Sequence, residues 1–184
     1  DVAAASDVIV GSSALLMQLE VPMETVVAAA TLAKRADVPI FLNPSPVQPL
    51  PAALLDGLDY LVVNDSELEA LTDGSGDAGR LFTAGVRRIV LTLGARGARL
   101  IEPGSTREVR PFQVPSIDTT AAGDAFLGAL AATLPDRGLD GALEAASAAG
   151  ALTTTRMGAQ PSLPAVQEVN AFLATRGARR DRRR

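Results

Sequence analysis

Acid–base chemistry in this chain of 184 residues must rest on a narrow set of side chains. The sequence contains no His, the commonest general base, and no Cys, so disulfides and thiolate metal sites are excluded. Lys34 is the only lysine and Tyr60 the only tyrosine. By elimination, the leading candidates for a general base are the carboxylates of Asp and Glu.

The segment DTTAAGDAFLGAL, over 118–130, places such a carboxylate at the start of a predicted helix. Three small residues precede it and let a ligand approach the backbone: Ala121, Ala122 and Gly123. The free N–H groups and the dipole of a first helical turn attract anions, and Asp124 in that turn can accept a proton. Phosphoryl transfer needs amides that hold phosphate oxygens and a carboxylate that accepts a hydroxyl proton. The alternative is a plain helix start with Asp118 or Thr119 as N-cap.

Apolar runs alternate with helical periodicity along the whole chain. Strands are predicted over 7–11, 13–20, 39–43, 59–64 and 87–94, with edge or hairpin strands at ARLIEP and REVRPFQV. Helices are predicted over 23–36, 50–58, 66–72, 77–86, 121–134, 139–155 and 164–175. This alternation predicts an α/β fold with a mostly parallel central sheet and helices on both faces. Ligands of such sheets bind at the carboxyl ends of the strands.

The composition, 47% hydrophobic and 21% charged, is that of a globular domain. A net charge of −4 argues against a nucleic-acid partner. No apolar run approaches the roughly 20 residues that a membrane span needs, and the start lacks the basic region of a signal peptide. We therefore expect a cytoplasmic protein without a membrane partner, with one domain over 1–175. The arginine-rich end, 176–184, is expected to be a disordered tail, although basic runs can also bind polyanions.

The segment DTTAAGD resembles the signature of the PfkB carbohydrate kinases, and its Thr-Ala-Ala form is similar to that of ribokinases. Other segments resemble ribokinases in the same order: SALLMQLE, FLNPSPVQPLP, VVNDSELEALT, IVLTLGARGARL and TTTRMGAQPSLP. The resemblance covers nearly all of 13–175. It implies a ribokinase-like fold and ATP-dependent phosphorylation of a sugar, with the 5-hydroxyl of D-ribose as the favoured acceptor. It also implies Mg²⁺ as cofactor and K⁺, a monovalent cation, as activator.

The resemblance further implies roles for individual residues. Asp124 matches the base that deprotonates the sugar hydroxyl, the amides of 121–124 match the anion hole, and Glu20 matches an acidic residue that contacts the sugar. The matches to ATP-binding positions are Asn64, Glu67, Thr92, Gly94, Ala95, Arg96, Gly97, Gly123 and Ser147. The matches to the monovalent cation site are Asp118, Thr120, Thr153, Arg156, Gly158 and Ser162. A guanidinium cannot ligate a cation, so Arg156 could contribute only its carbonyl.

Several of these positions also have simpler interpretations. Asn64 and Glu67 have the form of a capping box, the turn at 92–97 that of a hairpin, and Gly158 that of a helix C′ residue. The segment GSGDAG, over 74–79, satisfies G-x-G-x-x-G, but it follows a helical pattern instead of a strand. We interpret it as an ordinary loop.

Departures from the ribokinase pattern limit these expectations. Ser147 stands where ribokinases usually carry Asn or His near the adenine. The sugar clamp, the Gly-Gly-Lys-Gly-type motif and the lid strands, which often form the dimer contact, have no match in this chain. We therefore expect a chain truncated at the N-terminus, either a fragment of a longer, homodimeric parent or a decayed copy. Two alternatives stay open: a kinase of other specificity, such as a fructokinase or nucleoside kinase, and a non-catalytic nucleotide-binding fragment.

Overall fold

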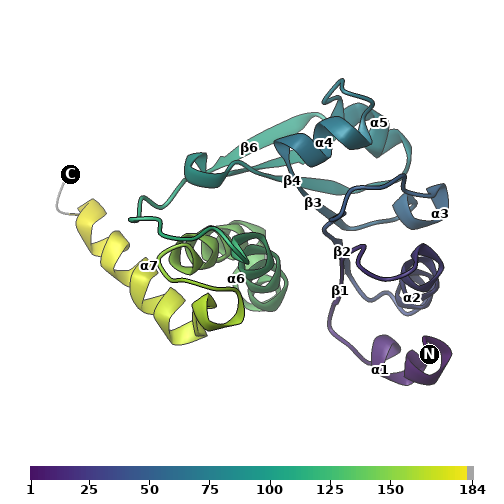
Figure 1. Cartoon of the computed structure of the whole chain (residues 1–184), viewed down its shortest axis with the longest axis horizontal. Helices are drawn as coiled ribbons and strands as arrows, with labels where there is room; N and C mark the ends of the chain where they lie inside the picture. Colours follow the sequence, from purple (N-terminus) through teal and green to yellow (C-terminus); the bar gives the residue numbers. More distant parts are fainter. Residues whose placement is uncertain (182–184) are drawn as a thin grey trace. The chain divides into compact units, whose positions relative to one another are not determined.

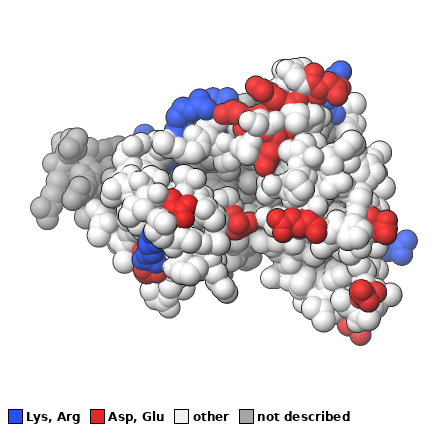
Figure 2. Space-filling model, in the orientation of Figure 1, with Lys and Arg blue, Asp and Glu red and all other residues white. Residues whose placement is uncertain are grey.

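The computed structural model describes residues 1–181, and their side chains up to 175 (Figure 1). The chain forms two compact units. Unit 1 comprises Asp1–Leu93 and Arg99–Glu108, and unit 2 comprises Gly94–Ala98 and the chain from Val109 on. On the face shown in Figure 2, acidic and basic side chains are interspersed and most of the surface is uncharged.

A six-stranded sheet with the strand order β1-β2-β3-β4-β5-β6 is the centre of the fold. Its strands are β1 (Leu15–Met17), β2 (Ile40–Leu42), β3 (Tyr60–Asn64), β4 (Arg88–Thr92), β5 (Ala98–Glu102) and β6 (Ser105–Val109). The first four strands are parallel. Only two residues join β5 to β6, which is too short for a parallel crossover, so this pair is antiparallel. The predicted α/β fold with a mostly parallel sheet is confirmed.

Unit 1 packs its helices on one face of this sheet. They are α1 (Ser6–Val10), α2 (Met23–Arg35), α3 (Ala52–Leu55), α4 (Asp65–Leu71) and α5 (Ala78–Thr83), after a 3₁₀ turn η1 (Ala3–Ala5). Leu61 and Val63 of β3 share a hydrophobic core with Ala30 and Ala33 of α2, whereas Val62 lies on the other face. This alternation follows the two-residue period of a strand.

The strand predicted over 7–11 is wrong. The segment is the short helix α1, in which Val8 and Val10 are 75% and 50% exposed. Three apolar residues in a row, Val8–Val10, do not distinguish a strand from one helical turn, and their β-branched side chains favour a strand in the sequence pattern. The sheet therefore begins at β1.

Unit 2 is built mainly from the helices α6 (Ala122–Thr153) and α7 (Val166–Asp181). The backbone of α6 reverses at Gly138, where φ is 66° and ψ is 176°. The two helices predicted over 121–155 are thus the halves of a helical hairpin, and Ala125 of the first half packs against Ala145 and Ala148 of the second. Short 3₁₀ turns lie at η2 (Gly94–Arg96) and η3 (Gln160–Ser162).

The end of the chain is described only in part. Helix α7 continues to Asp181, past the predicted end at 175. Of the predicted tail, residues 182–184 and the side chains of 176–181 lie outside the described residues. No helix within the described range is long and apolar enough to cross a membrane.

Candidate functional site

The start of α6 is unusual in its capping. The N-cap residue is Ala121, in the left-handed conformation with φ 59°, and no side chain caps the turn. The alternative that Asp118 or Thr119 is the N-cap is therefore wrong. The Ala122 amide donates to the Thr119 carbonyl at 3.2 Å. Because the first amides of a helix have no intrahelical partner, and no side chain caps this turn, its other amides are suited to an external anion.

Two residues of this first turn are accessible to solvent. Gly123 and Asp124 are both exposed. A Cβ atom built on Gly123 would meet no other atom within 4 Å. The Asp124 carboxylate is therefore on the surface of unit 2, in the first turn of α6, where a ligand can reach it together with the turn's amides.

Asp118 joins the two segments predicted to form a cation site. Its carboxylate accepts hydrogen bonds from the Thr120 backbone at 2.9 Å, the Thr120 hydroxyl at 2.7 Å and the Gly158 backbone at 2.8 Å. The Thr120 hydroxyl, then the Thr120 and Gly158 amides, lower the pKa of Asp118 below its ordinary value of 3.8. The Thr154 carbonyl also accepts from the amides of Ile117 and Asp118. The predicted halves of the site do come together.

The side chains of the other predicted cation ligands have partners within the protein. The Thr153 hydroxyl donates to the Ala149 carbonyl at 2.9 Å, and the Ser162 hydroxyl donates to the Ala159 carbonyl at 2.6 Å. The Arg156 guanidinium pairs with Glu168. One carboxylate with neighbouring carbonyls suits a hard cation.

Gly158 is not the C′ residue of α6. The helix ends at Thr153 with Thr154 as C-cap, so Gly158 lies four residues beyond the cap. Its φ of 88° belongs to the following loop, where its amide turns toward Asp118. The glycine is therefore part of the tie between two loops, not of the helix end.

The glycine-rich turn after β4 is packed against a distant segment of unit 2. A Cβ on Gly97, at φ 93°, would lie 2.2 Å from the Val109 carbonyl oxygen, so only glycine fits there. The Ser147 hydroxyl donates to the Arg110 carbonyl at 3.3 Å. Two predicted ATP-binding positions, Gly97 and Ser147, thus contact neighbouring residues of one strand-to-loop segment. The turn also joins β4 to β5, which is the connection that the hairpin interpretation of 92–97 predicts.

The other predicted nucleotide residues lie in unit 1. Asn64 and Glu67 form a complete capping box at the start of α4, with both bonds at 2.9 Å. Asn64 pairs in register with Thr92, so both stand at the carboxyl ends of neighbouring strands. Glu20 is exposed after β1 and borders a shallow hollow lined partly by Leu16 and Val21.

Sequence reasoning missed Asn43. This residue directly follows β2, and its amide donates to the Val62 carbonyl at 3.0 Å and to the Glu67 carboxylate at 3.4 Å. Asn43 belongs to the ribokinase-like segment FLNPSPVQPLP, but the sequence pattern assigns it no role. Its position at the carboxyl end of a parallel strand was the signal that could have identified it.

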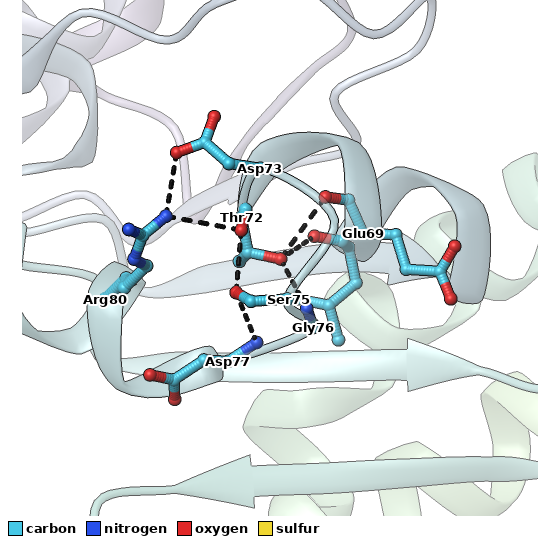
Figure 3. A network of polar contacts seen from close by, with 8 residues as sticks. Glu69, Thr72, Asp73, Ser75, Gly76, Asp77 and Arg80 are labelled. Carbon is cyan, nitrogen blue, oxygen red and sulfur yellow. Dashed lines mark hydrogen bonds and ion pairs between the residues drawn. The ribbon is translucent and has the colours of Figure 1, made fainter.

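Residues 74–77 of the G-x-G-x-x-G segment form a loop, as predicted, whereas Ala78 and Gly79 begin α5 (Figure 3). The buried Thr72 hydroxyl donates to the Leu68 carbonyl at 2.7 Å and accepts from the Gly76 amide at 2.8 Å. The Ser75 hydroxyl accepts from the Asp77 amide, and the Asp77 carboxylate accepts from the Gly79 amide. Because the loop satisfies these amides internally, it does not present them to a phosphate.

These features define a class: an α/β protein with polar side chains at the carboxyl ends of parallel strands and an anion-receptive helix start beside an exposed aspartate. A family comparison makes the class specific. The chain matches the pfkB family of carbohydrate kinases over residues 1–166, and it belongs to that family.

Individual proteins that are similar to this chain are ribokinases. The ribokinase of Haemophilus influenzae is 39% identical over 171 residues, which are 88% of this chain and 56% of that protein. The ribokinase of Staphylococcus aureus is 33% identical over 180 residues, 92% of this chain and 59% of that protein. The structure of Thermotoga maritima ribokinase has a TM-score of 0.84 at 35% identity, covering 92% of this chain and 59% of that one. The chain thus spans less than two thirds of these relatives.

Proposed function

We propose that this chain carries the phosphoryl-transfer residues of a sugar kinase that uses ATP, with D-ribose as the favoured substrate and ribose 5-phosphate as the product. The observation that carries the proposal is the exposed Asp124 in the uncapped first turn of α6. The ribokinase relatives support it, as does a structure of Arabidopsis thaliana ribokinase complexed with ribose and ATP, similar at a TM-score of 0.87 and 28% identity. We also propose a cytoplasmic, homodimeric parent protein.

In this mechanism Asp124 accepts the proton of the sugar hydroxyl as its oxygen attacks the γ-phosphorus. The new bond joins that oxygen to phosphorus, and the bond from phosphorus to the β–γ bridging oxygen breaks, so that ADP leaves. The amides of 121–124 hold the migrating phosphoryl oxygens, whose negative charge the helix start stabilises. Glu20 contacts the sugar.

Two further groups of residues hold the nucleotide and its ions. Gly94–Gly97 and Ser147 contact ATP, while Asn64 and Glu67 orient the phosphates. The Glu67 carboxylate is held by the Asn64 amide and Asn43, and a single carboxylate with substrate phosphates suits Mg²⁺. Bound Mg²⁺ neutralises phosphate charge. The described residues contain no group of three acidic side chains that could hold a metal alone.

The monovalent cation would be held by Asp118 and backbone carbonyls of the loop after α6. The Asp118 carboxylate accepts three hydrogen bonds and keeps lone pairs for a cation. Thr120 contributes through its backbone, and Thr153, Arg156, Gly158 and Ser162 through theirs. A K⁺ ion there would add positive charge near the start of α6.

Substitution of the proposed base tests the mechanism. In the complete kinase, Asp124→Asn should lower turnover by roughly 10²–10⁴-fold, the usual contribution of a general base, while ATP affinity stays nearly unchanged. Asp136→Asn, an exposed aspartate of the same helix, is the matched control and should keep full turnover. Near-normal turnover in Asp124→Asn would contradict the proposal.

A second candidate is phosphorylation of another sugar. A deoxyribokinase of Salmonella typhi is 32% identical over 170 residues, which favours a close pentose as the alternative substrate. Comparing kcat/KM for ribose, 2-deoxyribose, fructose and nucleosides in the complete kinase decides between them. Calorimetry of ATP and ribose with the 184-residue chain tests the remaining alternative, a non-catalytic nucleotide-binding fragment, which would bind ATP without ribose.

A further inference from the structure

The Arg156 side chain extends from the loop after α6 to helix α7. Its Nη2 atom donates to Glu168 Oε1, and its Nη1 lies 3.5 Å from Oε2. Two guanidinium nitrogens therefore face two carboxylate oxygens, the arrangement in which Arg binds a carboxylate with the most directional control. Glu168 raises the pKa of Arg156, and Arg156 lowers the pKa of Glu168, so both groups are charged at neutral pH.

Glu168 is itself held by the start of α7. Its Oε2 accepts the Ala165 amide at 2.8 Å, the bond by which a first-turn Glu caps a helix. The next residue, Val169, is buried in the alanine-rich core between the halves of α6 and α7. The carboxylate that Arg156 contacts is thus fixed to a packed helix and not to another loop.

The loop that carries Arg156 also contacts the Asp118 segment on both sides of that arginine. Two residues before it, the Thr154 carbonyl accepts the Ile117 amide at 2.7 Å. Two residues after it, the Gly158 amide donates to Asp118 at 2.8 Å. Of these three contacts, only that of Arg156 connects the pair of loops to α7.

We propose that the Arg156–Glu168 ion pair positions the 154–158 loop, and with it the Gly158 amide and the loop carbonyls, against Asp118. Both are positioning residues: neither side chain touches a reacting atom. The proposal rests on the proposed function in one respect, since the loop it positions is the one that would hold the monovalent cation. Breaking the pair should therefore loosen the Asp118–Gly158 contact and weaken the effect of K⁺, with little change in the KM for the sugar.

Three variants of the full chain separate this role from simple stability. Arg156→Gln removes the charge of one partner. Glu168→Gln removes the charge of the other while its amide oxygen can still accept the Ala165 amide, so that the cap of α7 survives. The exchange of both residues, R156E with E168R, restores opposite charges. Arg99→Gln is the matched control, because Arg99 pairs with Glu108 at 2.7 Å with a similarly exposed side chain, in unit 1.

The first measurement needs no ligand and no activity. Hydrogen exchange of the Gly158 amide requires this loop to open. Exchange should be roughly two- to fivefold faster in both single variants, the range expected when an exposed ion pair is lost, and should recover at least partly in the exchanged pair. Arg99→Gln should leave it unchanged. Unaltered Gly158 exchange in folded Arg156→Gln would overturn the proposal.

The second measurement concerns the cation. The thermal unfolding midpoint is followed in KCl and in tetramethylammonium chloride at equal ionic strength. The K⁺ concentration that gives half-maximal stabilisation should rise by roughly two- to fivefold in the single variants. Faster Gly158 exchange with no specific K⁺ effect in any variant would refute the cation site and that part of the proposed function, but would establish the positioning role.

Discussion

Gly123 combines a helical backbone with open space on the side where a side chain would project. We expect Gly123→Ala to raise the free energy of unfolding by about 0.5–1 kcal/mol, because Ala loses less backbone entropy in a helix. The same methyl group would occupy the space next to the proposed anion-binding amides. Turnover of the complete kinase should fall on the order of 10²-fold, as misplacement of a reacting group does.

Gly128→Ala is the control for this substitution. Gly128 lies in the same helix, and a Cβ there would also meet no atom within 4 Å. It should give a similar gain in stability, measured by urea unfolding, with unchanged turnover. If Gly123→Ala kept the turnover of Gly128→Ala, the first turn of α6 would not be the phosphoryl site.

Ala121 holds a backbone conformation that L-residues adopt at a cost. Its φ of 59° is left-handed, where Ala is about 1 kcal/mol or more less favourable than Gly. Ala121→Gly should therefore raise the free energy of unfolding by up to about 1 kcal/mol. Ala122→Gly, one residue later in the helix, should lower it by a similar amount. A loss of stability in Ala121→Gly would show that the left-handed backbone is not strained.

At the scale of elements, the inner strands carry a stack of side chains across the sheet. Phe41 of β2 and Tyr60 of β3 have ring centroids 4.5 Å apart, and Arg88 of β4 lies 5.3 Å from the Tyr60 ring. Burial raises the pKa of Tyr60 above its ordinary value of 10, and Arg88 opposes this shift. The folded state thus holds the phenol proton more tightly than the unfolded state.

The stabilising contribution of this proton is complete below pH 10 and is lost as the pH rises through the folded-state pKa. We expect urea unfolding midpoints to fall above pH 10, and to fall less in Tyr60→Phe. Because Tyr60 is the only tyrosine and the chain has no Trp, the absorbance of the phenolate reports its pKa directly. A phenolate titration with its midpoint near or below pH 10 in the folded protein would contradict the expected rise in the pKa of Tyr60.

Most elements could be predicted because buried parallel strands form continuous apolar runs, as at Ile40–Leu42, and helices show their own period. The elements of α6 were found, but not the left-handed start at Ala121. The contact of Asp118 with Gly158 joins residues that are 40 positions apart, which no local pattern encodes. The resemblance, not the periodicity, indicated that these two segments belong together. Asn43 was missed because its partner, Glu67, lies on another element.

At the scale of the molecule, the predicted site residues divide between the two units. Unit 2 contains the α6 start, the turn at 94–97, Ser147 and the loops joined by Asp118. Unit 1 contributes Glu67 at the start of α4. Because the proposed function assigns Glu67 to the nucleotide phosphates, its substitution must weaken the binding of MgATP.

This requirement gives a binding test that needs no sugar. MgATP at about 100 times its Kd should raise the free energy of unfolding by about 2.7 kcal/mol.

Glu67→Gln keeps an oxygen for the Asn64 amide, so the capping box survives, but it removes the carboxylate proposed to orient the Mg²⁺–phosphate group. Its Kd for MgATP should rise roughly tenfold or more, whereas that for ATP in EDTA should change little. Glu69→Gln, an exposed glutamate of the same helix, should match the unsubstituted chain. Equal MgATP affinity in Glu67→Gln and Glu69→Gln would remove Glu67 from the proposed nucleotide site, because the two variants differ only in which carboxylate of α4 is lost.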